Sequence, residues 1–227
     1  MTSQKTFHNE KCWRIIPSCY PTINLFERVV EADDLEAVFE IEALTNDRLR
    51  DEVGNLSLVK SEDRISGPNT SYIMAAFTHL NPQGSRFSDG TWGGYYAAFS
   101  LETSIAETKY HRAKFLSFTK EDPIHIDMRV LSAKVSGDLN DISTPDYLAQ
   151  EIYHPENYAA SQGFARHLKE SNANGLFYQS VRHKSGQNIA VFKPRLLKNC
   201  VQEQHLEYVW NGFEISAIFE KKLLKAS

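Results

Sequence analysis

The sequence predicts an α+β fold with a mainly antiparallel sheet, and three observations support this prediction. Segments rich in β-branched and aromatic residues recur from Tyr72 to the end of the chain. The helical segments between them do not alternate regularly with the strands, as a doubly wound sheet would require. A length of 227 residues suits one domain with an added terminal segment. We therefore expect a helical N-terminal extension over residues 1–70 and a sheet-bearing unit over residues 71–227, within a single globular unit.

The N-terminal extension contains one strongly helical pattern. Residues 25–52 carry apolar side chains at mostly helical spacing, and Asp33 and Asp34 lie near the expected start of a helix, where the helix dipole favours carboxylates. This pattern predicts an acidic amphipathic helix or helix pair. Residues 60–70, KSEDRISGPNT, have the composition of a surface loop.

The remainder of the chain contains six segments with the composition of strands. These segments are SYIMAAFTH, GGYYAAFS, PIHIDMRV, GLFYQSV, NIAVFK and EISAIFE. Two amphipathic helices are expected between them, over residues 101–118 and about 157–170. Ser100 is expected to cap the first of these helices, and Glu102 lies in its first turn, where a carboxylate is favoured.

Composition and charge argue against several classes of protein. No uninterrupted apolar run approaches the roughly 20 residues of a membrane span, and the first residues lack the apolar core of a signal peptide, so we expect a cytoplasmic protein without a membrane partner. The net charge of -4 disfavours direct nucleic-acid binding, which depends on clustered Lys and Arg. The three cysteines follow no metal or redox spacing and are predicted to be free thiols, and no metal site is expected.

The most informative stretch is residues 81–107, NPQGSRFSDGTWGGYYAAFSLETSIAE. Its glycine-rich loop lets the backbone approach a ligand closely, and the loop carries Arg86, whose planar guanidinium can bind a diphosphate in bidentate fashion. The following strand alternates Tyr95 and Tyr96, one of which is expected to face a ligand and stack on a flat ring. The helix that comes next carries Glu107. A binding site is therefore predicted where the loop, the strand and the helix meet.

Both charged residues of this stretch also have ordinary structural interpretations. Arg86 could form a salt bridge with Asp89, and Glu107 could pair with His111 or Arg112 on a solvent-exposed helix face. The strand and the glycine-rich loop next to Glu107 favour the functional interpretation.

A second informative segment is residues 175–194, GLFYQSVRHKSGQNIAVFKP, which reads as two strands joined by a polar turn. Ser180 lacks the G-x-S-x-G pattern of a nucleophile, and no acid is identifiable that would orient His183 as its base. A hydrogen-bonding role for Ser180 is therefore more credible, with a strand serine satisfied by the backbone as the structural alternative.

These motifs occur in a fixed order: GSRF, YYAA, S-x-x-T-x-I-A-E, G-L-x-Y-x-S-V-R and N-I-A-V-F-x-P. Together they resemble the RES-domain toxins of bacterial type II toxin–antitoxin pairs, over about residues 72–194. The family is named for an Arg, a Glu and a Ser, which match Arg86, Glu107 and Ser180. The resemblance implies a fold similar to ADP-ribosyltransferases and depletion of NAD+ by cleavage of its nicotinamide–ribose bond, with NAD+ as the substrate and no other cofactor.

The resemblance also implies roles for individual residues. Glu107 would stabilise the oxocarbenium-like transition state, Arg86 would hold the diphosphate, and Tyr96 would stack on or orient the nicotinamide ribose. Ser180 would hydrogen-bond the nicotinamide end of the substrate. The remaining residues that we assign to substrate binding are Ser100, Arg182 and Asn188.

The implied partner is an antitoxin with an Xre-like helix-turn-helix domain, and the oligomeric state stays open, with a homodimer as one option. The acceptor of ADP-ribose also stays open among water, phosphate and a protein side chain. The chain departs from the family pattern in residues 1–70 and in Phe87, where shorter members typically have Trp. Two alternatives remain: a ribonuclease toxin using His183, Arg182 and Glu107, and a non-catalytic module that binds NAD+.

Overall fold

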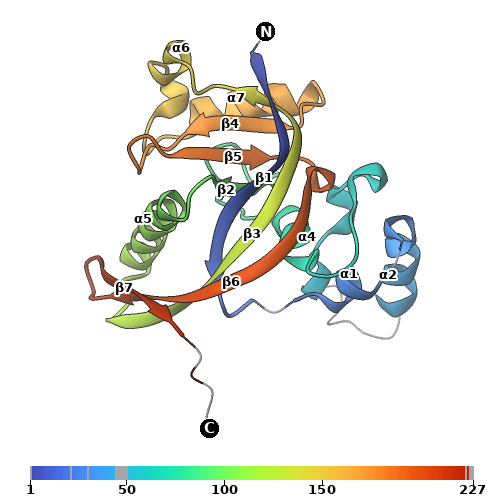
Figure 1. The fold of residues 1–227 in the computed structure, drawn as a ribbon, viewed down its shortest axis with the longest axis horizontal. Coiled ribbons are helices and arrows are strands. Elements are labelled where there is room, and N and C mark those ends of the chain that lie inside the picture. The colour runs from blue at the N-terminus through green and yellow to red at the C-terminus, as the bar shows by residue number, and fades with distance from the viewer. Residues whose placement is uncertain (1, 21, 30, 44–50, 223, 225–227) are drawn as a thin grey trace.

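The computed structural model describes residues 2–20, 22–29, 31–43, 51–222 and 224. Its centre is a curved sheet of seven strands in the order β1-β2-β5-β4-β3-β6-β7 (Figure 1). All neighbouring strands are antiparallel except β3 and β4, so the mainly antiparallel α+β fold is confirmed. The strands are β1 (Ser3–Pro17), β2 (Tyr95–Ala98), β3 (Ile124–Asp141), β4 (Gly175–Gln179), β5 (Gln187–Val191), β6 (Leu197–Trp210) and β7 (Ile215–Lys221).

Strand β1 corrects the prediction that residues 1–70 are helical. Strand β1 pairs with β3 along nearly its whole length. Because β1 also pairs with β2, the strands β1, β2, β5, β4 and β3 form a closed ring in which each strand pairs with the next. The register shifts between His8 and Glu10, where Asn9 has a φ of 64°. Because this bulge interrupts the alternation of buried and exposed side chains, the local sequence pattern does not reveal the strand.

The helical part of the N-terminal segment begins at α1 (Asn24–Arg28) and continues through the 3-10 turn η1 (Ala32–Asp34) and α2 (Leu35–Ala43). The predicted acidic helix pair is confirmed over this range, and residues 44–50 of that prediction lie outside the described residues. Two further 3-10 turns follow, η2 (Leu56–Leu58) and η3 (Ser61–Asp63).

The segment SYIMAAFTH forms helix α4 (Ser71–Thr78), so the prediction of a strand there is wrong. Its buried apolar residues Ile73, Met74 and Phe77 lie at helical spacing, but a short apolar run of this kind does not distinguish a helix from a strand by periodicity alone. The carboxylate of Glu27, distant in sequence, accepts a hydrogen bond from the Ser71 N–H at 3.1 Å. This contact satisfies a donor of the first helical turn, where a negative charge is favourable.

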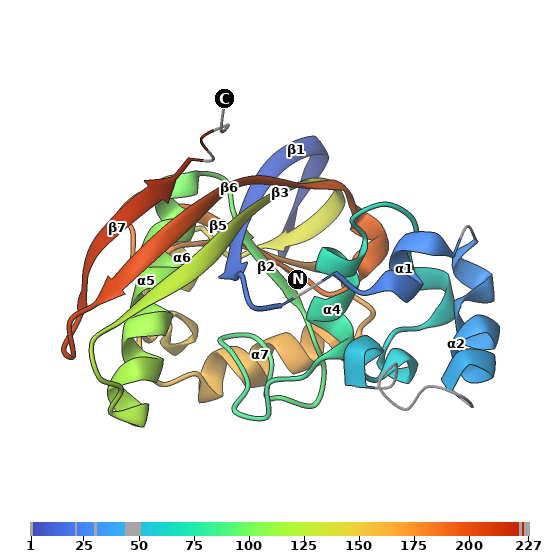
Figure 2. The same cartoon turned by 90° about the horizontal axis from the view of Figure 1, so that it is seen from below.

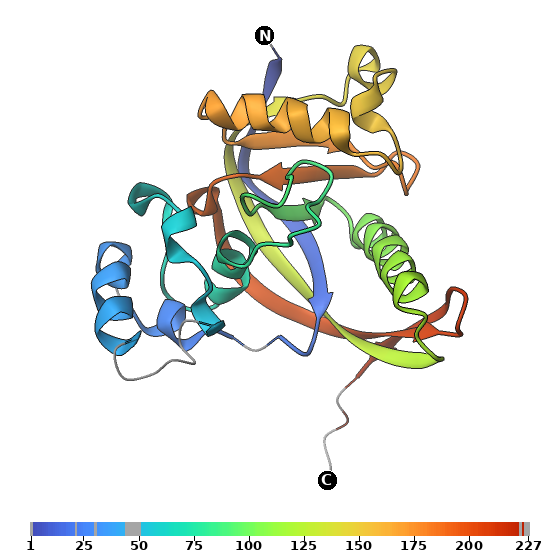
Figure 3. The ribbon, with the colours of Figure 1, turned by 180° about the vertical axis from the view of Figure 1, so that it is seen from behind.

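The helices predicted over residues 101–118 and about 157–170 are confirmed as α5 (Leu101–Thr119) and α7 (Ala159–Glu170). Short helix α6 (Pro145–Leu148) and the 3-10 turn η4 (Glu151–Tyr153) precede α7, and η5 (Pro194–Leu196) follows β5. Figures 2 and 3 show α5 and α7 on the same side of the curved sheet. Within the described ranges, no helix is both long enough and apolar enough to cross a bilayer.

Three apolar clusters hold these elements together. One joins the N-terminal helices and α4 to β2 and β5, so the N-terminal segment packs directly on the sheet. A second lies between α7 and strands β4 and β5 and includes Phe87, Trp92 and Tyr178. A third lies between α5 and strands β3, β6 and β7. The hairpin β4–β5 and the N-terminal part of α5 thus occupy fixed positions.

Candidate active site

Glu107 lies on α5 and is held by two side chains from the β4–β5 hairpin. Its Oε1 accepts hydrogen bonds from Ser180 Oγ at 2.6 Å and from Asn188 Nδ2 at 2.8 Å. Among the described residues no donor contacts Oε2. Asn188 is 98% buried, so the surrounding core fixes the position of the amide that donates to Glu107. Glu107 therefore does not form the solvent-exposed pair with His111 or Arg112, and its carboxylate has one defined orientation.

Ser180 connects this carboxylate to the backbone of the turn that follows β4. Its Oγ donates to Glu107 and accepts from the N–H groups of Arg182 at 3.0 Å and His183 at 2.9 Å. These three contacts use the whole hydrogen-bonding capacity of a hydroxyl. Such a hydroxyl is suited to orient the carboxylate and is poorly suited to act as a nucleophile.

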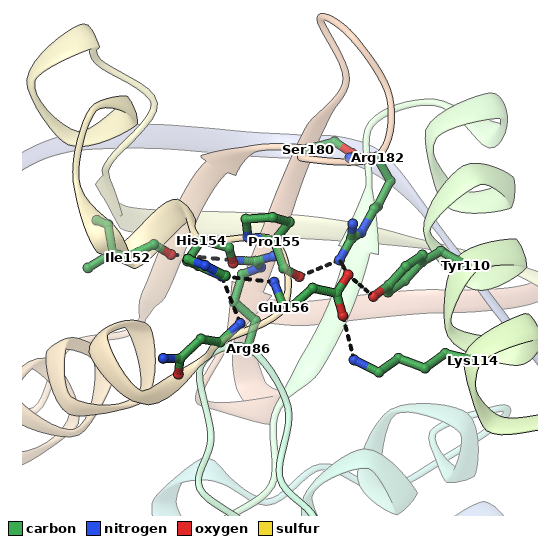
Figure 4. A network of polar contacts seen from close by, with 10 residues as sticks. Arg86, Tyr110, Lys114, Ile152, His154, Pro155, Glu156, Ser180 and Arg182 are labelled. Carbon is green, nitrogen blue, oxygen red and sulfur yellow. Dashed lines mark hydrogen bonds and ion pairs between the residues drawn. The ribbon is translucent and has the colours of Figure 1, made fainter. Parts of the chain in front are cut away.

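Arg86 does not form the salt bridge with Asp89 that its sequence position would allow. Asp89 instead pairs with Arg166 of α7. The Arg86 Nη1 donates to the carbonyl oxygens of Ile152 at 3.3 Å and His154 at 3.0 Å, and the guanidinium lies 4.6 Å from the ring centroid of Tyr158. The segment that precedes α7 thereby fixes the direction of the Arg86 side chain (Figure 4).

The same segment holds Arg182. Its Nη2 donates to the Pro155 carbonyl and contacts the Glu156 carboxylate at 3.4 Å, and its guanidinium lies 3.4 Å from the ring centroid of Tyr110. Figure 4 shows Arg86 and Arg182 converging on this segment from opposite sides. The two arginines are therefore positioned together by residues 152–156, and we refer to these residues as the arginine clamp.

Glu156 is the charged residue of the arginine clamp, and sequence reasoning missed it. Its carboxylate contacts Lys114 Nζ at 2.7 Å and the Tyr110 hydroxyl, both from α5. The hydrogen bond from Lys114, followed by that from Tyr110, lowers the pKa of Glu156 to about 2. The one sequence signal was the i, i+4 spacing of Tyr110 and Lys114 on a helix face, which does not indicate what that face contacts.

Tyr96 supports the loop that carries Arg86. Its hydroxyl is 2.7 Å from Ser85 Oγ and accepts a hydrogen bond from the Phe87 N–H at 3.2 Å. Burial raises the pKa of Tyr96 to about 12. Tyr95, on the opposite face of β2, is fully buried in the core, which confirms that the two tyrosines face opposite sides. Phe87 is buried too, and its ring centroid lies 4.8 Å from that of Tyr178 in an edge-to-face arrangement.

Ser100 caps α5, as predicted, because its Oγ accepts from the Thr103 N–H at 3.1 Å. Thr103 Oγ1 in turn lies 2.8 Å from His183 Nδ1, which ties the β4–β5 turn to the start of α5. The His183 ring is thus engaged by Thr103. This arrangement does not favour the acid–base role that the ribonuclease alternative assigns to His183.

Three charged groups of the site influence the neighbouring His111. His111 has a lowered pKa, caused first by desolvation; Glu107 opposes this effect, while Arg182 and Arg86 add to it. Glu107 and both arginines are therefore electrostatic neighbours of one side chain.

Among the residues that the structure describes, no cluster of three His, Cys, Asp or Glu side chains is suited to a metal ion. The fold and the site together define an α+β protein with an oriented carboxylate, Glu107, and with two arginines that residues 152–156 position.

Comparisons with known proteins identify the family. Residues 62–211, more than half of the chain, match the RES domain. The uncharacterized protein y4oC of Sinorhizobium fredii (strain NBRC 101917 / NGR234) is 34% identical over 211 residues, which cover 92% of this chain and 87% of that protein. The chain belongs to the RES domain family.

A more distant similarity is found among solved structures. A chain of the crystal structure of the M. tuberculosis MbcT-MbcA toxin-antitoxin complex aligns with a TM-score of 0.49 and 11% sequence identity. The alignment covers 88% of this chain and 87% of that chain. A similarity at this level does not assign a function.

Proposed function

We propose that this protein is the toxin of a bacterial toxin–antitoxin pair, and that it depletes NAD+ in the cytoplasm by cleaving the nicotinamide–ribose bond. Membership of the RES domain family supports this assignment, as do its three name-giving residues at Arg86, Glu107 and Ser180. The observation that carries the proposal is the Glu107 carboxylate, held on Oε1 by Ser180 and Asn188. Because of this oriented carboxylate, we also propose that the site has an arrangement similar to that of ADP-ribosyltransferases.

Glu107 would stabilise the charge that develops on the ribose. When the bond between nicotinamide and C1′ of the ribose breaks, its electron pair leaves with the nicotinamide, which departs as a neutral molecule. The ribose gains oxocarbenium character, and a nearby carboxylate stabilises that positive charge. A bond from an acceptor oxygen to C1′ completes the transfer, and a water acceptor loses one proton. Because the leaving group needs no protonation, the reaction does not require a second carboxylic acid.

The arginines would bind the diphosphate. Within the described part of the chain, the side-chain hydrogen bonds of Arg86 both use Nη1, and a guanidinium has five N–H donors, so Nη2 and Nε retain donors for an anion. Arg182 Nε is buried without a hydrogen-bond partner among the described residues. An unsatisfied buried donor is unfavourable, and such donors call for an explanation such as a missing ligand. Both features support a diphosphate beside the arginine clamp.

The other predicted residues would act mainly as supports. Tyr96 would position the loop of Arg86 and orient the nicotinamide ribose, and Asn188 and Ser180 would keep Glu107 directed at C1′. Ser100 would contribute by fixing the start of α5, because its hydroxyl is used in the helix cap.

Product analysis tests the reaction. The purified chain is incubated with NAD+, with and without inorganic phosphate, and the products are separated by chromatography. Nicotinamide with ADP-ribose indicates water as acceptor, a phosphorylated ADP-ribose indicates phosphate, and labelled protein indicates ADP-ribosyl transfer. A parallel incubation with RNA tests the ribonuclease alternative. Binding of NAD+ without release of nicotinamide would instead indicate a non-catalytic module.

The partner would be an antitoxin with an Xre-like helix-turn-helix domain. Occlusion is the simplest way to silence such a site, because blocking NAD+ requires no change in the toxin's shape. We infer that a terminal segment of the antitoxin places a carboxylate on Arg86 and competes with the substrate diphosphate. Calorimetry should then show that NAD+ and antitoxin exclude each other. Undiminished NAD+ affinity in a saturated complex would refute occlusion.

A further inference from the structure

A cavity lined by lysines lies outside the site described above. It has a volume of about 130 Å³ and is formed where five segments meet: residues 58–63, Phe77 of α4, Trp92 and Gly93 before β2, the end of α7 with the turn after it, and residues 192–194. Tyr158, which contacts Arg86, directly precedes α7, whereas Lys169 lies at the other end of this helix. At 1.5 Å per residue, the cavity and the arginine clamp are separated by roughly 15 Å along the helix axis.

Three ammonium groups and one carboxylate line this cavity. The ammonium groups belong to Lys60, Lys169 and Lys193, and the carboxylate belongs to Asp63. Arg195 Nε lies 2.8 Å from Asp63 Oδ1, so this carboxylate is already engaged. Within the described part of the chain, none of the three lysines has a carboxylate at ion-pair distance. The lining therefore carries an excess of positive charge.

One of these lysines is buried and another is half-buried. Lys193 is 93% buried, and its Nζ donates to the Asn172 carbonyl at 2.8 Å, which uses one of its three N–H donors. Lys169 Nζ lies 4.8 Å from the ring centroid of Trp92. Burial lowers the pKa of both lysines; Asp63 opposes this effect, and neighbouring cations, including Lys60, add to it. A bound anion would accept hydrogen bonds from these groups and relieve their mutual repulsion.

The size of the cavity limits the ligand. Pockets for drug-sized ligands have volumes of about 300–1,000 Å³. A cavity of about 130 Å³ is smaller than the lower end of that range. A dinucleotide is therefore too large, whereas a single tetrahedral oxyanion fits.

We propose that this cavity is a binding site for a free oxyanion of the size and charge of inorganic phosphate, held by Lys60, Lys169 and Lys193. A bound oxyanion would connect the N-terminal segment, through Lys60, to α7 and to the strand β5 that carries Asn188. It would thereby give residues 58–63 a role in stabilising the RES domain. The proposal does not depend on the cleavage of NAD+.

Calorimetric titration with inorganic phosphate at constant ionic strength tests this site. The full chain is compared with Lys169→Met, which keeps the apolar stem of the side chain and removes its charge. Loss of a charge-assisted hydrogen bond should weaken phosphate binding at least about tenfold. Lys60→Met, at a more exposed position, should act in the same direction. Lys109→Met removes an exposed lysine of α5 and should leave the affinity unchanged.

Two further titrations exclude other sources of binding. Arg182→Met should retain the wild-type phosphate affinity of the cavity, because Arg182 lies at the arginine clamp. Glycerol 3-phosphate should bind more weakly than inorganic phosphate, because esterification removes one of the oxyanion oxygens that would accept from the three lysines. The proposal is overturned by the absence of saturable phosphate binding, by equal affinity in Lys169→Met, by loss of binding in Arg182→Met alone, or by tighter binding of the monoester.

Discussion

The most direct test of the proposed chemistry is Glu107→Gln. The substitution keeps the size of the side chain and removes its charge. The amide oxygen of Gln can still accept from Ser180 Oγ and Asn188 Nδ2, which contact Glu107 Oε1 at 2.6 and 2.8 Å. The hairpin and α5 should therefore stay joined, and the melting temperature should change little. Any large loss of activity then reports on the missing charge.

The expected loss follows from the charge at the reacting carbon. Two unit charges 4 Å apart interact with about 4 kcal/mol at an effective dielectric constant of 20, which corresponds to roughly 10³-fold in rate. Part of this interaction already exists in bound NAD+, whose nicotinamide ring is positively charged, and only the difference between transition state and ground state accelerates the reaction. We therefore expect kcat to fall about 10²- to 10³-fold, with a small change in KM.

The assay is release of nicotinamide from NAD+ by the purified protein, with the melting temperature recorded for each variant. Glu102→Gln is the matched control, because Glu102 is an exposed carboxylate in the first turn of the same helix. It should retain wild-type kcat. A kcat for Glu107→Gln within about threefold of wild type, in a folded protein, would refute the electrostatic role of Glu107.

Three further predictions concern the supports of the site. Arg86→Lys should lower kcat/KM about 10- to 100-fold, because an ammonium cannot reproduce the bidentate fork; an unchanged value would assign Arg86 to anchoring the arginine clamp. Tyr96→Phe should lower the free energy of unfolding by about 1–3 kcal/mol in denaturant titrations, because it leaves the Phe87 N–H unpaired, and equal stability would contradict this. The folded pKa of Glu156, about 2, lies below the usual 4.5, so its contacts with Lys114 stabilise the fold above pH 4.5 and are lost as the pH falls toward 2. The stability difference between wild type and Glu156→Gln should shrink over that range, and a constant difference would show that Glu156 ionisation contributes nothing.

Sequence alone identified the residues that lie within continuous patterns. The boundaries of α5 and α7 followed from helical periodicity and from the cap at Ser100, because these signals depend on neighbours within a few residues. The order of the motifs likewise indicated Arg86, Glu107 and Ser180. Strand β1 and helix α4 were not predicted, because a bulge in one and a short apolar run in the other remove the period that distinguishes strands from helices.

The contacts that bring these residues together depend on the tertiary structure. Glu107 meets Ser180 and Asn188 across 73 and 81 residues of sequence, and strand pairing between β4 and β5 decides which of their side chains reach α5. A salt bridge to Asp89, three residues away, was the structural alternative for Arg86, but the carbonyl groups of Ile152 and His154 bind the guanidinium instead. Carbonyl groups are present at every residue and carry no sequence signal. Only the folded chain decides which of them face a given guanidinium.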